Sequence, residues 1–405
     1  MIKPHKKKLH VKLLSIIALN VFYLVTPGCK SLLFSEIKPS SKINNILVDS
    51  FATSETLNLY LNLKNFTRDK TLFGHQETTA YGVGWTYDGV NIESDVKKIS
   101  GDFPAVYGWD IGNIGKRTNN DCIPFEVMKK LIIDAYERGG INTISSHMYN
   151  PYTGNNYNDV KPTLPHILPG GTHHQKFIEK LDLIADFLKD LKTEDGIPIP
   201  IIFRPFHEHN GDWFWWGRGP AAEKDFVKLW KFTVDYFINE KEIHNLLFAF
   251  SPDRSRMVYP LSTSDYLYGY PGDNYVDIFG FDNYFDLDGI WNKAPIDQQK
   301  KSFKESLELI VDLAEEKNKI AALTETGSVN LRTKNWWTKL LLDGIETNNK
   351  TKKIAYLLVW RNEDFNHFHV PYLGHNDASD FLEFYKNPTI IFNSDLPDLY
   401  NEKVK

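Results

Sequence analysis

The sequence predicts an α/β protein built as a single (β/α)8 TIM barrel, with its active site at the carboxyl ends of the strands. Three observations support this prediction. Eight short β-rich runs recur along the chain, amphipathic segments separate them, and neither a linker nor an internal repeat divides residues 45–398. Parallel strands that alternate with helices are buried on both faces, and eight such units close into a barrel. The competing doubly wound sheet normally carries a Gly-rich phosphate turn, which this chain lacks.

The predicted strands are apolar runs that end in polar or aromatic residues. They cover residues 72–76, 103–112, 140–148, 198–208, 246–253, 276–284, 320–327 and 354–362. Apolar residues at helical spacing predict helices over residues 125–138, 174–192, 223–241, 298–317 and 334–348. In the second of these, apolar side chains recur every three or four positions from Phe177 to Leu188. Such a stripe packs against another element, here the outside of the barrel.

The amino terminus has the pattern of a bacterial export signal. Residues 1–28 combine a lysine-rich head with an apolar run that is shorter than the ~20 residues of a transmembrane helix. The alternative is a buried amino-terminal helix. Because the segment ends in Gly-Cys, it is similar to a lipoprotein signal, with Cys29 as the lipidated residue. Residues 29–44 are then a tether, residues 45–398 the (β/α)8 domain and residues 399–405 a tail. With Cys29 acylated, Cys122 lacks a partner and is predicted to be a packed thiol.

The composition is that of an ordinary globular protein. The chain has 405 residues, of which 42% are hydrophobic and 24% charged, and its net charge is -5. Lys and Arg total 47 against 52 for Asp and Glu, so no positive field favours nucleic acid as a partner. Aromatic residues make up 14% of the chain, and flat aromatic faces are good surfaces for stacking sugars or bases.

Every predicted strand ends in residues that a plain core would not select. Since the carboxyl ends of barrel strands converge on one face, these residues are expected to form one pocket. They are His75 and Gln76, Asp110, His147, His207 with Glu208, Asp253, Asp282 with Tyr284, Glu325, and Trp360 with Arg361. One such residue alone is more often a cap or a solvated loop charge, but eight strand ends together favour a binding site.

Two carboxylates, Glu208 and Glu325, are the predicted centre of this site. Cleavage of a glycosidic bond with retention needs one carboxylic acid and one nucleophilic carboxylate, about 5–5.5 Å apart. The ends of the fourth and seventh strands can face each other across a barrel mouth of that width. Aromatic residues crowd Glu208 in the string FRPFHEHNGDWFWWG, which favours it as the acid. Glu325 lies between two threonines, and the hydroxyl of Tyr284 is expected to hold it as the nucleophile.

Other chemistries fit the sequence less well. His207 and His209 straddle Glu208, but they do not match the i, i+4 histidine pair of a zinc protease helix. The chain has no G-x-S-x-G turn for a serine nucleophile, and two cysteines do not make a metal cluster by themselves. No catalytic metal and no cofactor are therefore expected.

Six strings at or near the predicted strand ends form a distinctive set: GHQ at 74–76, PAVYGWD at 104–110, RPFHEHNGDWFWWG at 204–217, DNYVDIFGFDNY at 273–284, TETG at 324–327 and VWRN at 359–362. With these strings the chain resembles the family 26 glycoside hydrolases, whose best-known members are β-1,4-mannanases, and in particular those of gut Bacteroides. The resemblance implies a (β/α)8 barrel that hydrolyses mannan, galactomannan or glucomannan, or their oligosaccharides, with retention. A minority of relatives cut mixed-linkage β-glucan or β-1,3-xylan.

The resemblance also implies roles for individual residues. Glu208 matches the general acid/base and Glu325 the nucleophile. Positions that orient these carboxylates or bind the sugar are His147, Arg204, His207, Trp213, Asp282, Tyr284, Trp360 and Arg361. Among them, Arg361 matches a residue that contacts the next sugar toward the non-reducing end.

Several alternatives remain open at this point. Endo action or release of mannobiose from chain ends depends on the loops at residues 113–122 and 150–172. A hypothesis from a different functional class is a non-catalytic glycan-binding lipoprotein, but the retention of both Glu208 and Glu325 argues against it. Residues 30–33 lack the acidic run associated with surface export in Bacteroides, so a periplasm-facing, monomeric lipoprotein is predicted, with membrane contact only through its lipid.

Overall fold

Eight parallel strands close into a barrel in the computed structural model, which describes residues 46–401. They are β1 (Thr71–Gln76), β4 (Val106–Asp110), β5 (Ile141–Ser145), β6 (Ile201–Arg204), β7 (Leu246–Phe250), β8 (Ile278–Asp282), β9 (Ile320–Thr326) and β10 (Tyr356–Val359). Each strand pairs with the next, and β10 pairs with β1 to close the ring. The predicted (β/α)8 barrel is confirmed, and every strand falls within one residue of its predicted run.

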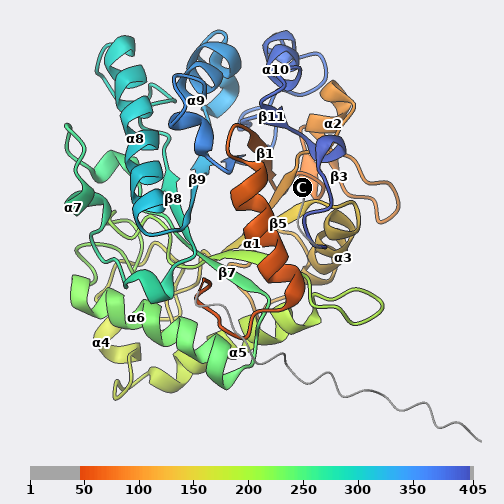
Figure 1. Cartoon of the computed structure of the whole chain (residues 1–405). Helices are drawn as coiled ribbons and strands as arrows, with labels where there is room; N and C mark the ends of the chain where they lie inside the picture. The colour runs from red at the N-terminus through yellow and green to blue at the C-terminus, as the bar shows by residue number, and fades with distance from the viewer. Residues whose placement is uncertain (1–45, 402–405) are drawn as a thin grey trace, which may run out of the picture. The chain divides into compact units, whose positions relative to one another are not determined.

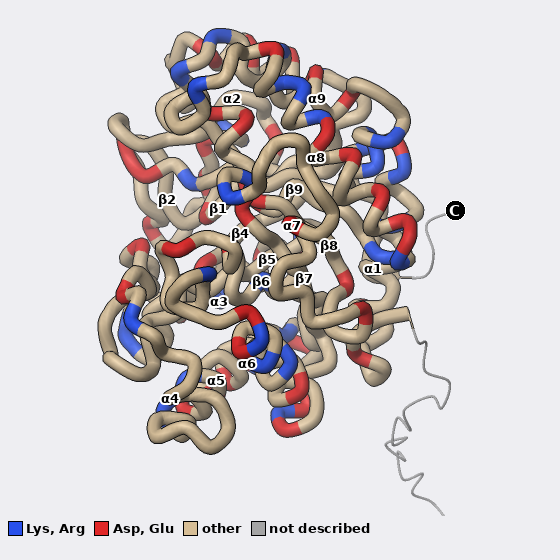
Figure 2. The backbone as a smooth tube through the Cα atoms, turned by 90° about the vertical axis from the view of Figure 1, so that its left-hand side faces the viewer, with Lys and Arg blue, Asp and Glu red and all other residues tan. Residues whose placement is uncertain are grey.

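Helices surround this barrel, as can be followed in Figure 2, which is turned by 90° from the view of Figure 1. The larger ones are α3 (Phe125–Glu137), α5 (His174–Asp190), α6 (Glu223–Asp235) and α8 (Ile296–Glu316). The predicted helix at 223–241 continues past α6 as a π-helical turn, Tyr236–Glu240, and the one at 334–348 consists of a π-helical turn, Trp337–Leu342, and α9 (Asp343–Ile345). Along the predicted stripe on α5, the side chains of Phe177, Leu181, Ile184, Ala185 and Leu188 are buried. Shorter helices are α2 (Asp95–Ser100), α4 (Leu164–Ile167), α7 (Thr263–Tyr266) and α10 (Ala378–Tyr385).

Helix α1 (Ser54–Phe66) closes the amino end of the barrel, in front of the strands in Figure 1. Its buried Leu59, Tyr60 and Leu63 join one apolar cluster with residues that fill the barrel interior. The hydroxyl of Tyr60 donates to the carbonyl of Asn318, just before β9 (2.9 Å). The floor of the barrel is therefore sealed, and the opposite end is the one available for a site.

The carboxyl-terminal residues also belong to the folded unit. Strand β11 (Ile390–Ile391) pairs in parallel with the start of β1. Leu399 and Tyr400, assigned to a tail from the sequence, are buried, and the hydroxyl of Tyr400 donates to the carbonyl of Gly140 (2.7 Å). The domain therefore extends past residue 398, because these side chains complete the core below the barrel.

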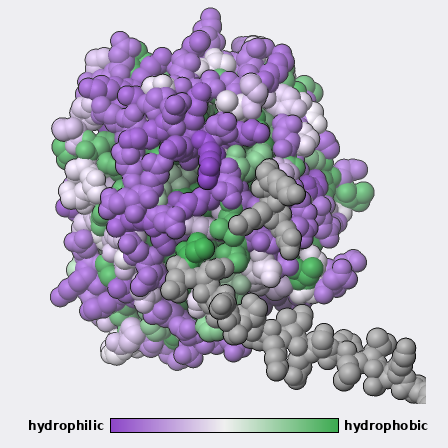
Figure 3. Space-filling view, in the orientation of Figure 1, coloured by the Kyte–Doolittle hydropathy of each residue, from purple (hydrophilic) through white to green (hydrophobic). Residues whose placement is uncertain are grey.

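Two expectations about the cysteines have different outcomes. Cys29, the signal at residues 1–28 and most of the tether lie outside the described residues. Cys122 is exposed, so the prediction of a packed thiol is wrong. It sits in a left-handed turn after β4 (φ 63°), which directs its side chain outward. Within residues 46–401, no helix is long and apolar enough to cross a membrane. The face in Figure 3 is mainly hydrophilic, with small separate apolar patches.

Candidate active site

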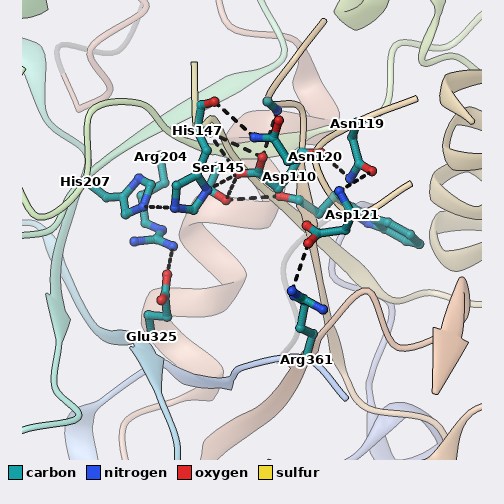
Figure 4. A network of polar contacts seen from close by, with 12 residues as sticks. Asp110, Asn119, Asn120, Asp121, Ser145, His147, Arg204, His207, Glu325 and Arg361 are labelled. Atoms are coloured by element: carbon teal, nitrogen blue, oxygen red, sulfur yellow. Dashed lines mark hydrogen bonds and ion pairs between the residues drawn. The ribbon is translucent and has the colours of Figure 1, made fainter. Parts of the chain in front are cut away.

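Arg204, at the end of β6, lies at the centre of the polar residues in the barrel mouth. Its guanidinium donates through Nη1 to Oδ2 of Asp282 (2.5 Å) and to Oγ of Ser251 (3.2 Å). Nη2 makes an ion pair with Oε2 of Glu325 (Figure 4). Burial opposes the charge of Arg204, but the carboxylates of Asp282 and Glu325 outweigh burial and raise its pKa. Arg204 is thus a permanent cation that joins the ends of β6, β8 and β9.

Glu325, in β9, is held at both carboxylate oxygens. Oε2 faces Arg204, and Oε1 accepts a hydrogen bond from the hydroxyl of Tyr284 (2.9 Å). Burial and the charge of Glu325 raise the pKa of Tyr284 well above its usual value, so this hydroxyl stays a donor. The residue is 5% exposed, which leaves a small opening toward the mouth. These contacts aim the carboxylate and limit its rotation.

Glu208 lies on the turn that follows β6, in a different environment. Phe206 and Glu208 both have left-handed backbone conformations (φ 50° and 52°), and the backbone N–H of Glu208 donates to the carbonyl of Ser251 (2.8 Å). Burial, followed by the negative charges of Asp253 and Glu325, raises the pKa of Glu208 well above its ordinary value. Burial also raises the pKa of Asp253 to about 6. Glu208 is therefore suited to remain protonated near neutral pH.

The aromatic residues that follow Glu208 have different roles. Trp213 is partly exposed and donates through Nε1 to Oε2 of Glu208 (2.7 Å). Phe214, Trp215 and Trp216 are buried. Trp215 and Trp216 donate to the carbonyls of Met148 and His207 respectively, each at 2.8 Å. Trp213 therefore faces Glu208, while the indoles of Trp215 and Trp216 anchor the turn.

A second group of polar residues continues from Glu208 to the far side of the mouth. His147, after β5, stands between Asp110 and His207 in Figure 4. Its Nδ1 is 2.8 Å from Oδ2 of Asp110, and its Nε2 is 3.2 Å from Nε2 of His207. Burial and the charge of Arg204 lower the pKa of His207 well below its usual value. Burial opposes protonation of His147, but Asp110 outweighs it and raises the pKa of His147.

A cavity of about 710 Å³ adjoins this group. Nη2 of Arg361, which follows β10, pairs with Asp121 (3.0 Å) and with Glu363 (3.2 Å) at its edge. Aromatic side chains supply much of its wall, among them Tyr81, Trp85, Tyr87 and Tyr157. Flat aromatic faces beside charged groups suit the apolar faces and hydroxyls of sugar rings.

Comparison with known proteins decides the family. The model of glycosyl hydrolase family 26 matches residues 48–354. The chain belongs to glycosyl hydrolase family 26. A family 26 β-mannanase from Bacteroides ovatus is 38% identical, with a TM-score of 0.78 over 86% of this chain and 98% of that chain. The resemblance inferred from the sequence, including its likeness to Bacteroides enzymes, is confirmed.

Two further family 26 relatives are similar over most of the chain. The catalytic domain of an endo-β-1,4-mannanase from Bacillus sp. JAMB-750 is 34% identical, with a TM-score of 0.81 over 90% of this chain and 98% of that chain. A mannan endo-1,4-β-mannosidase from Bifidobacterium adolescentis is 33% identical over 391 residues, which is 91% of this chain and 38% of the relative. The chain thus spans about two fifths of the length of that relative.

Most of the predicted site residues of this family 26 barrel lie together at the mouth. Trp360 is half-buried with its ring centroid 6.2 Å from that of His147. His75, predicted at a strand end, instead has a structural contact, a hydrogen bond with Thr78 (2.9 Å). His209, which follows Glu208, hydrogen-bonds to the carbonyl of Tyr268 (2.7 Å). Burial lowers their pKa values to about 3 and about 4. Residues 46–401 contain no group of three or more potential metal ligands.

Several residues that line or adjoin the site had no role assigned from the sequence. Asp121 and the aromatic hairpin of β2 (Tyr81–Gly82) and β3 (Trp85–Thr86) lie in loops and were not assigned a role. Glu77 is also buried against the site, where its Oε1 accepts from Asn119 (2.9 Å). The cluster of aromatic letters at 81–87 was the one available signal.

Proposed function

We propose that this family 26 protein is a mannan endo-1,4-β-mannosidase that hydrolyses β-1,4-mannosidic bonds with retention of configuration. The observation that carries the proposal is the contrast between two carboxyl groups in one mouth. The pKa of Glu208 is raised by burial and nearby negative charge, whereas Glu325 is held by Arg204 and Tyr284. Retaining glycosidases need one acid and one oriented nucleophile. The names of the relatives support mannan as the substrate.

In the first step, a carboxylate oxygen of Glu325 attacks the anomeric carbon as the bond to the leaving oxygen breaks. Glu208 gives its proton to that oxygen, which departs as an alcohol. The products are a glycosyl ester on Glu325 and an ionised Glu208. The N–H of Trp213, 2.7 Å from Oε2 of Glu208, stabilises the new negative charge.

In the second step, Glu208 takes a proton from water while the water oxygen attacks the anomeric carbon. The ester bond to Glu325 breaks, and both carboxyl groups return to their starting states. Two inversions at one carbon give net retention. The contacts with Arg204 and Tyr284 again stabilise the negative charge of the departing Glu325 carboxylate.

Binding of more than one sugar is supported by the cavity beside Arg361. Its volume of about 710 Å³ lies within the range of ordinary ligand pockets, ~300–1,000 Å³, so it offers space beyond the sugar being cleaved. This space favours cleavage within chains of mannan, galactomannan or glucomannan. Chromatography of early products tests the point: a mixture of lengths indicates endo action, and mannobiose as the sole product contradicts it.

The catalytic assignment is tested by a reducing-sugar assay on mannan. Glu208→Gln and Glu325→Gln should each lose about 10²–10⁴-fold or more in kcat. Glu137→Gln, at an exposed position near the end of α3, is the control and should match the wild type. Activity that survives Glu325→Gln would exclude this nucleophile. Wild-type protein that binds mannan but cuts neither mannan, lichenan nor xylan would instead be a glycan-binding protein.

We further propose export as a periplasm-facing lipoprotein, on the signal-like residues 1–28 and on Cys29. Cys29→Ala should move the protein from the membrane fraction to the soluble fraction. Removal of the protein by protease treatment of intact cells would contradict the periplasmic side.

A further inference from the structure

Asp110, at the end of β4, is a buried carboxylate that the two-step mechanism above does not use. It is 1% exposed. Its side chain accepts hydrogen bonds from Oγ of Ser145 (2.9 Å), the backbone N–H of Gly112 (2.8 Å), the backbone N–H of His147 (3.1 Å) and Nδ1 of His147 (2.8 Å). Burial acts to raise the pKa of Asp110, but His147 and these donors outweigh burial and lower it. Asp110 is thus an ionised acceptor throughout the neutral range.

An ionised acceptor at Nδ1 fixes the hydrogen on that nitrogen of His147. A carboxylate has no hydrogen to donate, so Nδ1 carries one whether the ring is neutral or protonated. The other nitrogen, Nε2, then faces Nε2 of His207 at 3.2 Å, and a single hydrogen between them makes the bond. Figure 4 shows Asp110, His147 and His207 in this order.

His207 depends strongly on this contact. Its Nδ1 is buried without a hydrogen-bond partner among residues 46–401, so Nε2 makes the side-chain hydrogen bond of this residue. The flanking residues, Phe206 and Glu208, both have left-handed backbones, and such strained conformations persist only where surrounding contacts hold them. The hydrogen bond between His147 and His207 is one of the contacts that hold the turn carrying Glu208.

We propose that Asp110 is a positioning residue for proton transfer by Glu208, acting through His147 and His207. The inference rests on the proposed function, because it assigns a task to the acid of that mechanism. Asp110 contacts neither carboxyl group of the reaction, and its effect passes through two imidazole rings. Loss of its charge frees His147 to adopt the other tautomer, which removes the defined bond to His207 and loosens the turn at Glu208.

Other charged or titratable groups also face these two rings. His147 is influenced by Glu325 from β9 and by Asp121 from the loop after β4, in addition to Asp110. It also contacts the ring of Tyr157 at 4.8 Å between centroids. His207 faces Arg204, His147 and His209, and burial together with these neighbours lowers its pKa well below the usual value. Among these groups, Asp110 is the one that accepts a hydrogen bond from Nδ1 of His147.

The matched test compares Asp110→Asn with Asp49→Asn. Asp49 makes the same contact with another histidine, Oδ2 to Nδ1 of His244 at 2.8 Å, and its side chain is equally buried, but it lies below the barrel. Asp110→Asn should lower kcat/KM on mannan about 10–100-fold, the range expected for a misplaced catalytic group. Asp49→Asn should stay within about threefold of the wild type, since its pair does not reach the site.

The choice of substrate separates positioning from a merely structural role. An aryl mannobioside with a strongly acidic phenol needs little help from an acid, so kcat/KM for Asp110→Asn should fall much less on this substrate than on mannan. An equal loss on both substrates would overturn the proposal. In a His147→Gln background, Asp110→Asn should cause no further loss, and additive losses would also overturn it.

A measurement on the wild type covers the case in which Asp110→Asn does not fold. Nitrogen-15 NMR of labelled histidine should show Nδ1 of His147 protonated across the neutral range. An unprotonated Nδ1 of His147 would refute the inference, and this result needs no variant. Wild-type protein that is inactive on mannan would refute the proposed function, whereas active wild type with an unaffected Asp110→Asn variant would refute this inference alone.

Discussion

Replacing Arg204 by methionine tests the electrostatic centre of the site. The substitution keeps much of the side-chain volume but leaves Asp282 and Glu325 buried without their shared cation. Removal of one partner from a buried ion pair costs about 3–5 kcal/mol, because the remaining charge is uncompensated. For residues 46–401, with an unfolding entropy of ~2.1 cal/mol/K per residue, this loss corresponds to a fall in Tm of about 4–7 °C.

The loss should depend on pH. Burial raises the pKa of Asp282 well above its ordinary value despite the presence of Arg204. Without Arg204 this carboxyl is still harder to ionise, so the variant is most destabilised where the wild type holds it charged. As the pH falls and Asp282 takes up a proton, the counter-charge is no longer needed. The difference in Tm between Arg204→Met and the wild type should therefore shrink as the pH is lowered.

The assay is calorimetry combined with kcat on mannan. Arg254→Met is the control, because Arg254 is an equally buried cation whose Nε lies 3.0 Å from Oδ2 of Asp286, outside the proposed machinery. Both variants should lose Tm, but only Arg204→Met should also lose kcat, by about 10²-fold or more, since it misorients Glu325, the proposed nucleophile. A variant Arg204→Met with wild-type Tm and kcat would refute the reasoning.

Three further predictions follow from the same site. As the proposed acid, Glu208 must be protonated to act, so activity should fall as the pH rises through its pKa. Trp213→Phe removes a hydrogen bond that lowers this pKa, so the alkaline limb of the pH–rate profile should move to higher pH. Asp253→Asn removes a negative charge that raises the same pKa, so that limb should move to lower pH, and limbs displaced in the opposite directions would contradict both assignments. In a Cys29→Ser background, a maleimide should label Cys122 in the native protein and lower kcat/KM on mannan, since this thiol lines the cavity; mass spectrometry and the reducing-sugar assay check it, and an unreactive thiol would count against its exposure.

The barrel strands were predictable because parallel strands buried on both faces are continuous apolar runs. Helix α1 was not predictable, because its apolar residues do not follow a helical period. Leu57, Leu59, Leu61 and Leu63 alternate with other residues in SETLNLYLNLKNF, which is a strand period. Packing across the barrel floor stabilises the helix despite this pattern. Strand β11 has two residues, too few to give a periodic signal.

The site residues were likewise predictable from the sequence only in part. Arg204, Asp282 and Glu325 meet because they end strands, and strand ends converge whatever the loops do. Asp121 reaches Arg361 through a loop whose path depends on turns that composition does not specify. Cys122 was placed in a core because free cysteines are usually buried, but a left-handed turn in that loop directs it outward.

The pairing of β1 also bears on how the chain is made. This strand is the first of the barrel to be synthesised, yet Leu72 pairs with Tyr356 on one side and with Ile391 on the other. Contacts between residues so distant in sequence form slowly and only after most of the chain exists. A nascent polypeptide that ends before residue 356 therefore exposes the edge of β1 that later pairs with β10. A chaperone that shields strand edges can bind this edge until translation is almost complete.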